Sequence, residues 1–290
     1  MSKILLLSFV MASALLSQKA FSALDFLAIK TAAQLSAVSY VRPDLIDKRL
    51  PQLNYALVHY AELPDSAVSY YLAHTTSGLQ QLAFRGTTNL ENVLVNIDVQ
   101  LQLNTNLGIQ LHQGFSTAAK AAYENVLPYL DKSKPVQTTG HSLGGAIAVI
   151  VGMYLQRDGF QLDQIITFGQ PKVTNVHGAD VFKNLPLMRV VTANDIVPLV
   201  PPLSPLQLKS LDIYWHNGVE VILLGEKKYA LVEGFKSMMR ATKFVSALPS
   251  EKNLRAHEIG RYLALIESNQ EGAQQMPYKL GFSLFGVTLD

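Results

Sequence analysis

The sequence predicts an α/β protein with a mostly parallel central sheet and helices on both faces. Between residues 111 and 192, β-prone runs alternate with helical patterns, which is the order of a parallel sheet. A long helical pattern at 111–130 connects to a β-prone run at 136–139, as a crossover connection requires. That run passes through a glycine-containing turn directly into a small-residue helix, predicted at 143–156.

Residues 1–22 are predicted to be a signal peptide that is removed from the fold. Lys3 gives a positive start, residues 4–16 are apolar, and residues 20–22 resemble a small-x-small cleavage site. The alternative is a short anchor helix, but the apolar run is too short to span a bilayer comfortably. We therefore expect export, to the periplasm or out of the cell. An exported chain with no cysteine is more typical of a bacterium than of a eukaryote.

The charge balance argues against a nucleic-acid partner. The net charge is +2, and removing residues 1–22 removes two lysines and no acid, so the mature chain is neutral. Nucleic-acid binding calls for a basic patch. The mature length, residues 23–290, fits one large domain. Only 16% of the residues are charged. Either an apolar functional surface or a large core explains this low fraction.

The first half of the chain reads as a helix followed by a hairpin that feeds the sheet. Asp25 is placed to cap a helix running to about residue 40, with Phe26, Ile29, Ala33 and Val38 near one face. Three β-prone runs follow at 55–63, 67–74 and 79–84, the last two separated by a turn at 76–78.

Two features follow the third of these strands. Gly86 allows a tight turn that frees the Thr87 amide from strand pairing, so this amide is a candidate oxyanion donor; an ordinary strand-end turn is the alternative. Residues 90–97 then carry apolar groups at helical spacing. A helix there is either a lid over the site, at about 88–98, or a core helix. Residues 98–103 alternate as a strand.

The second half continues the alternation of strands and helices. Strands are predicted at 165–168 and 188–192, with a short helix at 177–183 between them. A loop at 193–198 leads into a proline-rich stretch. Residues 213–216 and 220–224 are predicted to form a hairpin across Asn217 and Gly218.

The candidate nucleophile is Ser142, in Gly140-His-Ser-Leu-Gly144. This is the G-x-S-x-G pattern of a nucleophile elbow, in which the serine occupies a strained turn between a strand and a helix. Glycines at 140 and 144 allow the close contacts that such a turn needs. A plain Gly-Ser loop is the alternative, but the pattern lies between a strand signal and a helix signal.

The acid and the base follow from chain order, which in hydrolases with this elbow is serine, acid, histidine. Five aspartates lie between Ser142 and His257, at positions 158, 163, 180, 195 and 212. Asp195 alone follows a strand, so it reaches the same carboxyl edge as the elbow. Two histidines follow Asp195. His216 falls inside a predicted strand pair and is expected to pack, whereas His257 is expected at the start of a helix running to about residue 268, which favours His257 as the base.

These residues define a hydrolytic mechanism that needs no metal or cofactor. His257 would take the Ser142 proton as the hydroxyl attacks an ester carbonyl, and Asp195 would fix the imidazole tautomer. The amides of Leu143 and Thr87 would hold the oxyanion. His141 is expected to pack beside the elbow.

The chain resembles the fungal-type, or class three, triacylglycerol lipase family. The matching stretches are Ala83-Phe-Arg-Gly-Thr87, His112-x-Gly-Phe115, Thr139-Gly-His-Ser-Leu-Gly-Gly-Ala146, Thr167-Phe-Gly-Gln-Pro171, Asn194-Asp-Ile-Val-Pro198 and Tyr214-Trp-His216. The resemblance implies an α/β-hydrolase fold, oxyanion residues at Thr87 and Leu143, a lid just after Thr87, a structural His216 and a catalytic His257. In departure from many relatives, the lid region has no tryptophan, and the cysteine pairs of secreted eukaryotic members are absent.

Residues 225–250 look like an insertion before the histidine. Phe235, Met238 and Phe244 are apolar there, while Lys236 and Arg240 supply charge. The segment is either a basic amphipathic helix that touches a lipid surface or a helix that covers the core.

The expected function is that of a secreted serine lipase or esterase acting on lipid esters of the triacylglycerol type, in transient contact with a lipid surface. A phospholipase A1 or a soluble-ester hydrolase is the alternative within the same chemistry. A non-catalytic lipid-binding protein is a third possibility, disfavoured because a binder does not need all three of Ser142, Asp195 and His257. Neither acyl-chain preference nor oligomeric state follows from the sequence.

Overall fold

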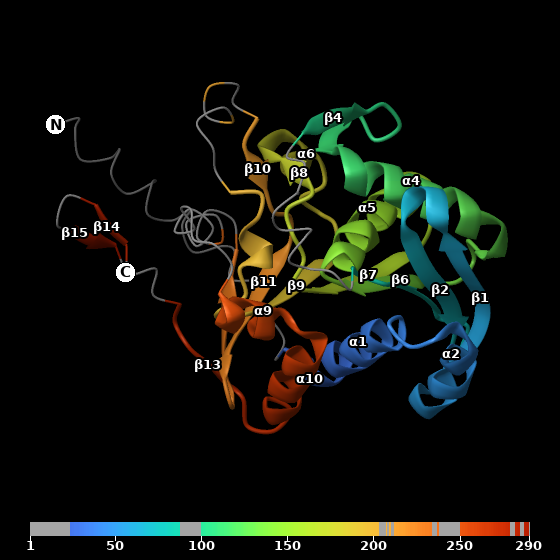
Figure 1. Ribbon diagram of the computed structural model, residues 1–290, viewed down its shortest axis with the longest axis horizontal. Coiled ribbons are helices and arrows are strands. Elements are labelled where there is room, and N and C mark those ends of the chain that lie inside the picture. Colours follow the sequence, from blue (N-terminus) through green and yellow to red (C-terminus); the bar gives the residue numbers. More distant parts are fainter. Residues whose placement is uncertain are drawn as a thin grey trace, which may run out of the picture.

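A mostly parallel sheet forms the centre of the molecule. The computed structural model describes residues 24–87, 100–202, 207, 209, 212–233, 237, 250–278, 282–284 and 287–289. Within these residues nine strands form one sheet in the order β1-β2-β3-β6-β7-β9-β11-β12-β13 (Figure 1). The strands are β1 (Ala56–Leu63), β2 (Val68–His74), β3 (Gln80–Phe84), β6 (Val136–His141), β7 (Leu162–Phe168), β9 (Leu187–Thr192), β11 (Val219–Gly225), β12 (Lys228–Val232) and β13 (Gln274–Gln275).

Strands β3, β6, β7, β9 and β11 run parallel to one another, so their carboxyl ends meet at one edge of the sheet. Strands β1 and β2 add to this block as an antiparallel hairpin, and β12 pairs antiparallel with β11. The sequence prediction of a mostly parallel sheet is confirmed. The shared carboxyl edge is where open α/β sheets hold their ligands.

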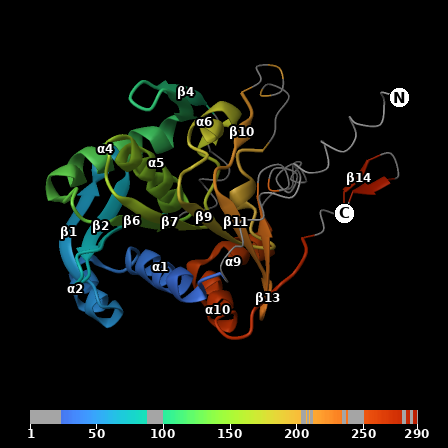
Figure 2. The same cartoon turned by 180° about the vertical axis from the view of Figure 1, so that it is seen from behind.

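Helices cover both faces of this sheet. α4 (Gln113–Val126) and α5 (Leu143–Arg157) lie on one face, and α1 (Phe26–Val38) and α10 (Ile259–Ser268) lie on the other (Figures 1 and 2). The shorter helices are α2 (Pro43–Arg49), α6 (Val176–Val181) and α9 (Glu251–His257). None of the described helices is long and apolar enough to cross a membrane.

A smaller sheet lies beside the central one in the order β10-β8-β5-β4. Its strands are β10 (Tyr214–Trp215), β8 (Thr174–Asn175), β5 (Ile109–His112) and β4 (Leu101–Asn104). Near the C-terminus, β14 (Phe282–Leu284) pairs with β15 (Val287–Leu289).

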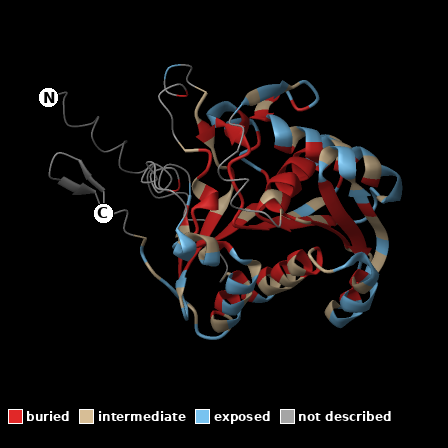
Figure 3. Ribbon diagram, in the orientation of Figure 1, coloured by how far each residue is buried: buried red, intermediate tan, exposed pale blue. Residues whose placement is uncertain are grey.

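The most buried helix is α5, which follows the candidate nucleophile. Every residue from Gly144 to Leu155 is buried, because the helix lies between the sheet and α4 (Figure 3). Its small residues permit this close packing, and its lack of a polar stripe is typical of a helix enclosed on all sides. The elbow therefore sits on a rigid, fully packed support.

Helix α1 forms as the sequence predicts. The Asp25 carboxylate accepts hydrogen bonds from the amides of Leu27 and Ala28, at 2.9 and 3.0 Å, and so caps the helix. Phe26, Ile29, Ala33 and Val38 are all buried on the face that meets the sheet.

The hairpin predicted across Asn217 and Gly218 is wrong. β10 pairs with β8 of the smaller sheet, whereas β11 enters the central sheet beside β9. The Asn217 side chain donates to the carbonyls of Ala179 and Phe182 instead of closing a turn. The apolar centre of β11, Val221 and Ile222, gains complete burial in the central sheet.

The signal peptide predicted at 1–22 and the lid predicted at about 88–98 lie outside the described residues. So does most of the 225–250 segment. Its first part is a strand rather than a helix, because Tyr229, Ala230 and Val232 pack as β12 against β11.

Two further predictions concern the bounds of elements. The strand expected at 98–103 is β4 in its described part. His257 ends the short helix α9, rather than starting a helix, and α10 begins two residues later.

Candidate active site

Ser142 occupies a strained turn between β6 and α5. Its backbone angles are φ 58° and ψ −128°, a conformation that non-glycine residues rarely adopt. A Cβ at Gly140 would lie 2.3 Å from the Gly144 carbonyl carbon, and one at Gly144 would lie 2.1 Å from the Phe84 carbonyl oxygen. Both glycines are therefore required for the elbow, as the sequence predicts.

The two candidate oxyanion residues flank this turn. Leu143 is the first residue of α5, where amides have no acceptor within the helix. Thr87 lies directly after Gly86, and a Cβ at Gly86 would be 3.2 Å from the Ser142 Cβ. The loop that follows β3 thus reaches the side of the serine, and the helix N-terminus faces it with a partial positive charge.

His257 and Asp195 form a buried pair. The His257 Nδ1 lies 2.8 Å from Asp195 Oδ2, and both side chains are almost completely buried. Among the described residues the His257 Nε2 has no hydrogen-bond partner. A histidine held by a carboxylate on one nitrogen, with the other nitrogen unpaired, is arranged to accept a proton.

The serine and this pair meet at the end of β7. The Ser142 amide donates to the Phe168 carbonyl at 2.9 Å. At the next residue, Gly169, φ is +57°, and a Cβ would lie 2.7 Å from His257 Cε1 and 2.8 Å from Asp195 Oδ2. One strand end therefore touches both the elbow and the His257–Asp195 pair.

Two further groups donate hydrogen bonds to the Asp195 carboxylate. The Val197 amide binds Oδ1 at 2.8 Å, and the Tyr262 hydroxyl donates to Oδ2 at 2.5 Å. Burial alone would raise the pKa of Asp195, but the nearby His257 and these hydrogen bonds outweigh burial, so its pKa lies below the usual value. The carboxylate is therefore held ionised beside the imidazole.

Sequence reasoning missed Tyr262. It lies on α10, five residues after His257, and its ring is fully buried. A tyrosine at helical spacing is indistinguishable from an ordinary core aromatic until the partner of its hydroxyl is known.

His216 lies apart from this arrangement. Its Nε2 is 2.7 Å from the Pro198 carbonyl, an interaction that ties β10 to the loop after Asp195. This agrees with its expected packing. Within the described residues no group of three or more His, Asp or Glu side chains is arranged to hold a metal ion.

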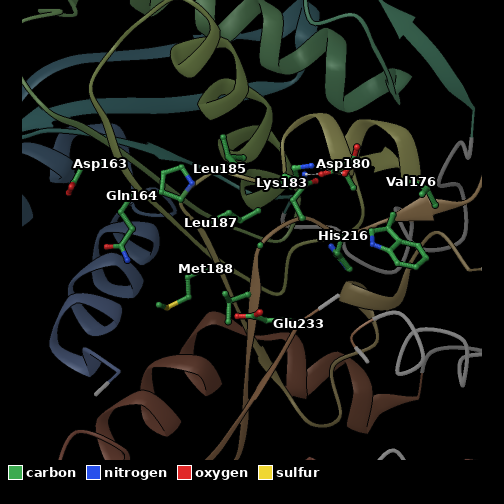
Figure 4. A pocket seen from close by; sticks show the side chains of 16 residues that line it. Asp163, Gln164, Val176, Asp180, Lys183, Leu185, Leu187, Met188, His216 and Glu233 are labelled. Carbon is green, nitrogen blue, oxygen red and sulfur yellow. Dashed lines mark hydrogen bonds and ion pairs between the residues drawn. The ribbon is translucent and has the colours of Figure 1, made fainter. Parts of the chain in front are cut away.

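A cavity of about 820 Å³ is lined in part by His216 but not by Ser142, Asp195 or His257. It is lined by the amino ends of β7, β9 and β11, through Asp163, Leu187 and Val219, and by Asp180 and Lys183 of the α6 region (Figure 4). None of the five predicted site residues lines it. Open α/β sheets bind their ligands at the carboxyl ends of the strands, and this cavity lies at the amino ends. The candidate active site is therefore the group of side chains around Ser142 and not this cavity.

The central sheet, its flanking helices and the strained turn at Ser142 together define an α/β-hydrolase fold. Residues 81–204 match the family model described as lipase (class 3). These residues include Thr87, Ser142, Leu143 and Asp195, while His257 lies beyond them.

Two curated relatives and one solved structure illustrate the similarity. The chain is 31% identical over 150 residues to secreted mono- and diacylglycerol lipase 1 of Fusarium solani, covering 47% of this chain and 44% of the relative. It is 30% identical over 147 residues to a lipase of Rhizomucor miehei, covering 46% and 40%. The lipase structure from Rhizopus microsporus var. chinensis superposes with a TM-score of 0.60 at 24% identity, covering 69% of this chain and 75% of the other.

The matches span less than half the length of these curated relatives, and the structural likeness supports the fold alone. Both curated relatives are fungal, so they give no support to the bacterial source expected from the sequence.

Proposed function

We propose that the protein is a serine lipase or esterase that hydrolyses carboxylic esters of lipids. The observation that carries this proposal is the buried His257–Asp195 pair, with an unpaired Nε2, at the same sheet edge as the strained Ser142. The names of the curated relatives support lipid esters as the substrate class.

In the proposed reaction, the Ser142 hydroxyl attacks the ester carbonyl while its proton passes to His257 Nε2. Asp195, bound to Nδ1, keeps Nε2 unprotonated beforehand and stabilises the imidazolium that forms. The amides of Thr87 and Leu143 hold the negative oxygen of the tetrahedral intermediate. The imidazolium then protonates the departing alcohol, and water, activated by the same histidine, releases the acid from Ser142.

Contact with a lipid surface is part of the proposal. The printed names of the curated relatives, which are lipases, support this contact. The sequence of residues 1–22 and the printed name of the Fusarium solani relative support export.

The test is hydrolysis of a substrate series by the full chain and by Ser142→Ala. We expect activity on triacylglycerols, partial acylglycerols or short soluble esters, and a fall of about 10⁴-fold or more in kcat for Ser142→Ala. Phospholipids form a separate arm, in which a preferred cleavage would identify a phospholipase A1.

Two results would overturn the proposal. If folded Ser142→Ala still hydrolyses the esters, Ser142 is not the nucleophile. Absence of hydrolysis across the whole series, with equal lipid binding by wild type and Ser142→Ala, would identify a lipid-binding protein instead.

A further inference from the structure

A buried hydrogen-bonded chain lies directly behind the proposed site. The Tyr40 hydroxyl is 2.8 Å from His141 Nδ1, and His141 Nε2 is 2.6 Å from the backbone carbonyl of His257. The His141 side chain is buried, and its ring lies 4.5 Å from the His257 ring, measured between centroids. None of these contacts is used in the reaction proposed above.

Chemistry sets the direction of each hydrogen bond. The His257 carbonyl can only accept, so His141 must carry its proton on Nε2. The Nδ1 is then an acceptor, and the Tyr40 hydroxyl must donate to it. The Tyr40 oxygen in turn accepts from the Gly86 amide. His141 stays neutral in this arrangement, because burial and the neighbouring His257 lower its pKa to about 3.

This chain of bonds joins three parts of the site that are far apart in sequence. Gly86 precedes the proposed oxyanion residue Thr87, His141 precedes Ser142, and the His257 carbonyl belongs to the proposed base. Tyr40, just beyond α1, connects them from behind. Contact with Gly86 is so close that a Cβ there would lie 2.2 Å from the Tyr40 hydroxyl and 2.5 Å from the His141 carbonyl oxygen.

We propose that Tyr40 and His141 are positioning residues, which set the distance of the Gly86–Thr87 amides and of the His257 backbone from Ser142. This inference rests on the proposed hydrolase function. Neither side chain touches the reacting atoms. Their effect is on alignment, and small misalignments of catalytic groups cost much more in rate than in stability.

Tyr40→Phe tests the proposal, since it keeps the ring and removes the hydroxyl. On a short soluble ester, we expect kcat to fall about 10-fold or more while KM changes less than about 2-fold. Inactivation by an alkyl phosphonate, which needs the same serine, base and oxyanion donors, should slow in parallel.

Tyr71→Phe is the matched control. The Tyr71 hydroxyl is also buried and donates to a backbone carbonyl, that of Leu35 on α1, at 2.6 Å. This variant should lower the melting temperature by a similar amount and leave kcat within about 2-fold of wild type, because the hydroxyl that it removes bonds to α1 and not to a residue of the proposed site. Equal kcat in folded Tyr40→Phe and Tyr71→Phe would overturn the proposal.

A second measurement does not depend on activity. The ¹⁵N spectrum of the His141 imidazole should report a proton on Nε2 in wild type, and the Nδ1 signal should shift in Tyr40→Phe as its donor is lost. A proton on Nδ1 in wild type would overturn the hydrogen-bond chain. If wild type hydrolyses no ester, the proposed function fails, while this spectrum still tests the arrangement.

Discussion

Gly169 is the residue that lets the end of β7 touch the His257–Asp195 pair. We expect Gly169→Ala to lower kcat about 100-fold, because a Cβ 2.7–2.8 Å from both side chains must displace them. The left-handed backbone at this position adds a stability cost of about 1–2 kcal/mol. Steady-state kinetics on a soluble ester, combined with urea unfolding, measures both effects.

Gly159→Ala is the control for backbone strain. Gly159 also has a positive φ, +76°, and a Cβ there meets nothing within 4 Å. It should lose a similar amount of stability and keep full activity. If Gly169→Ala also keeps full activity, the close contact with His257 and Asp195 has no catalytic importance.

Tyr262 stabilises the ionised Asp195. A carboxylate whose pKa is depressed in the folded state contributes stability above its unfolded pKa of about 3.9, and this stability is lost as pH falls through the folded pKa. Tyr262→Phe removes one donor and raises that pKa. We expect the unfolding free energy at pH 7 to fall by about 1.5–3 kcal/mol and acid unfolding to begin at higher pH.

Tyr71→Phe is again the reference, since its hydroxyl binds a neutral carbonyl. It should lower the unfolding free energy by about the same amount at every pH, so that its profile of stability against pH stays parallel to that of wild type. A Tyr262→Phe variant that behaves identically to Tyr71→Phe would contradict a specific effect on Asp195.

Among single residues, the sequence predicts those that lie in a motif or at a fixed place relative to a strand. Ser142 lies in a pattern, Asp195 follows a strand, and His257 comes after both; the structure brings the last two within 2.8 Å. Tyr40 and Tyr262 could not be predicted, because their roles depend on which buried group their hydroxyls meet. Only the packing of distant segments decides that.

The N-terminus of α5 packs directly against the backbone at the end of β3. A Cβ at Gly144 would meet the backbone oxygen of Phe84 at 2.1 Å, and backbone cannot move aside as a side-chain end can. We expect Gly144→Ala to cost more than about 3 kcal/mol of unfolding free energy, as severe overpacking does. Denaturant unfolding of the purified variant measures this.

Gly260→Ala, also within a helix, is expected to stabilise the protein. Gly260 lies in α10, and a Cβ there meets nothing within 4 Å. Alanine should stabilise by about 0.5–1 kcal/mol, through helix propensity. Similar changes in unfolding free energy for Gly144→Ala and Gly260→Ala would mean that the structure has room for a methyl group between α5 and β3.

Elements were predicted well where periodicity and caps agreed, as in α1 and in the strands of the parallel block. The hairpin at 213–224 failed for a physical reason. Both of its runs are β-prone, but partner choice depends on burial in a sheet that sequence periodicity alone does not describe. β11 buries its apolar side chains between β9 and β12 of the central sheet, while β10 pairs with β8 of the smaller sheet.

The stability of the whole molecule should depend on pH through His141. Its pKa is about 3 in the folded state and about 6.5 when unfolded, so the unfolded chain binds the extra proton between these values. The unfolding free energy should therefore fall as pH decreases from about 6.5 toward 3, by about 1.4 kcal/mol per pH unit from this group. Urea unfolding at pH 7, 6 and 5 measures the slope.

His141→Gln isolates this contribution, because glutamine does not titrate. The variant should show a shallower slope than wild type over the same range, whatever its stability at pH 7. Parallel slopes would contradict a buried neutral His141.

The order of residues along the chain has a consequence for biosynthesis. The proposed site draws Tyr40 from the start of the described chain, Ser142 from the middle, and His257 and Tyr262 from near the end; α1 and α10 also meet through Lys30 and Glu267. A nascent chain that has not yet delivered residue 262 has a serine but no completed base. If the proposed site is correct, nascent chains that stop before residue 262 cannot hydrolyse lipid esters, and activity appears only once this residue has joined the fold.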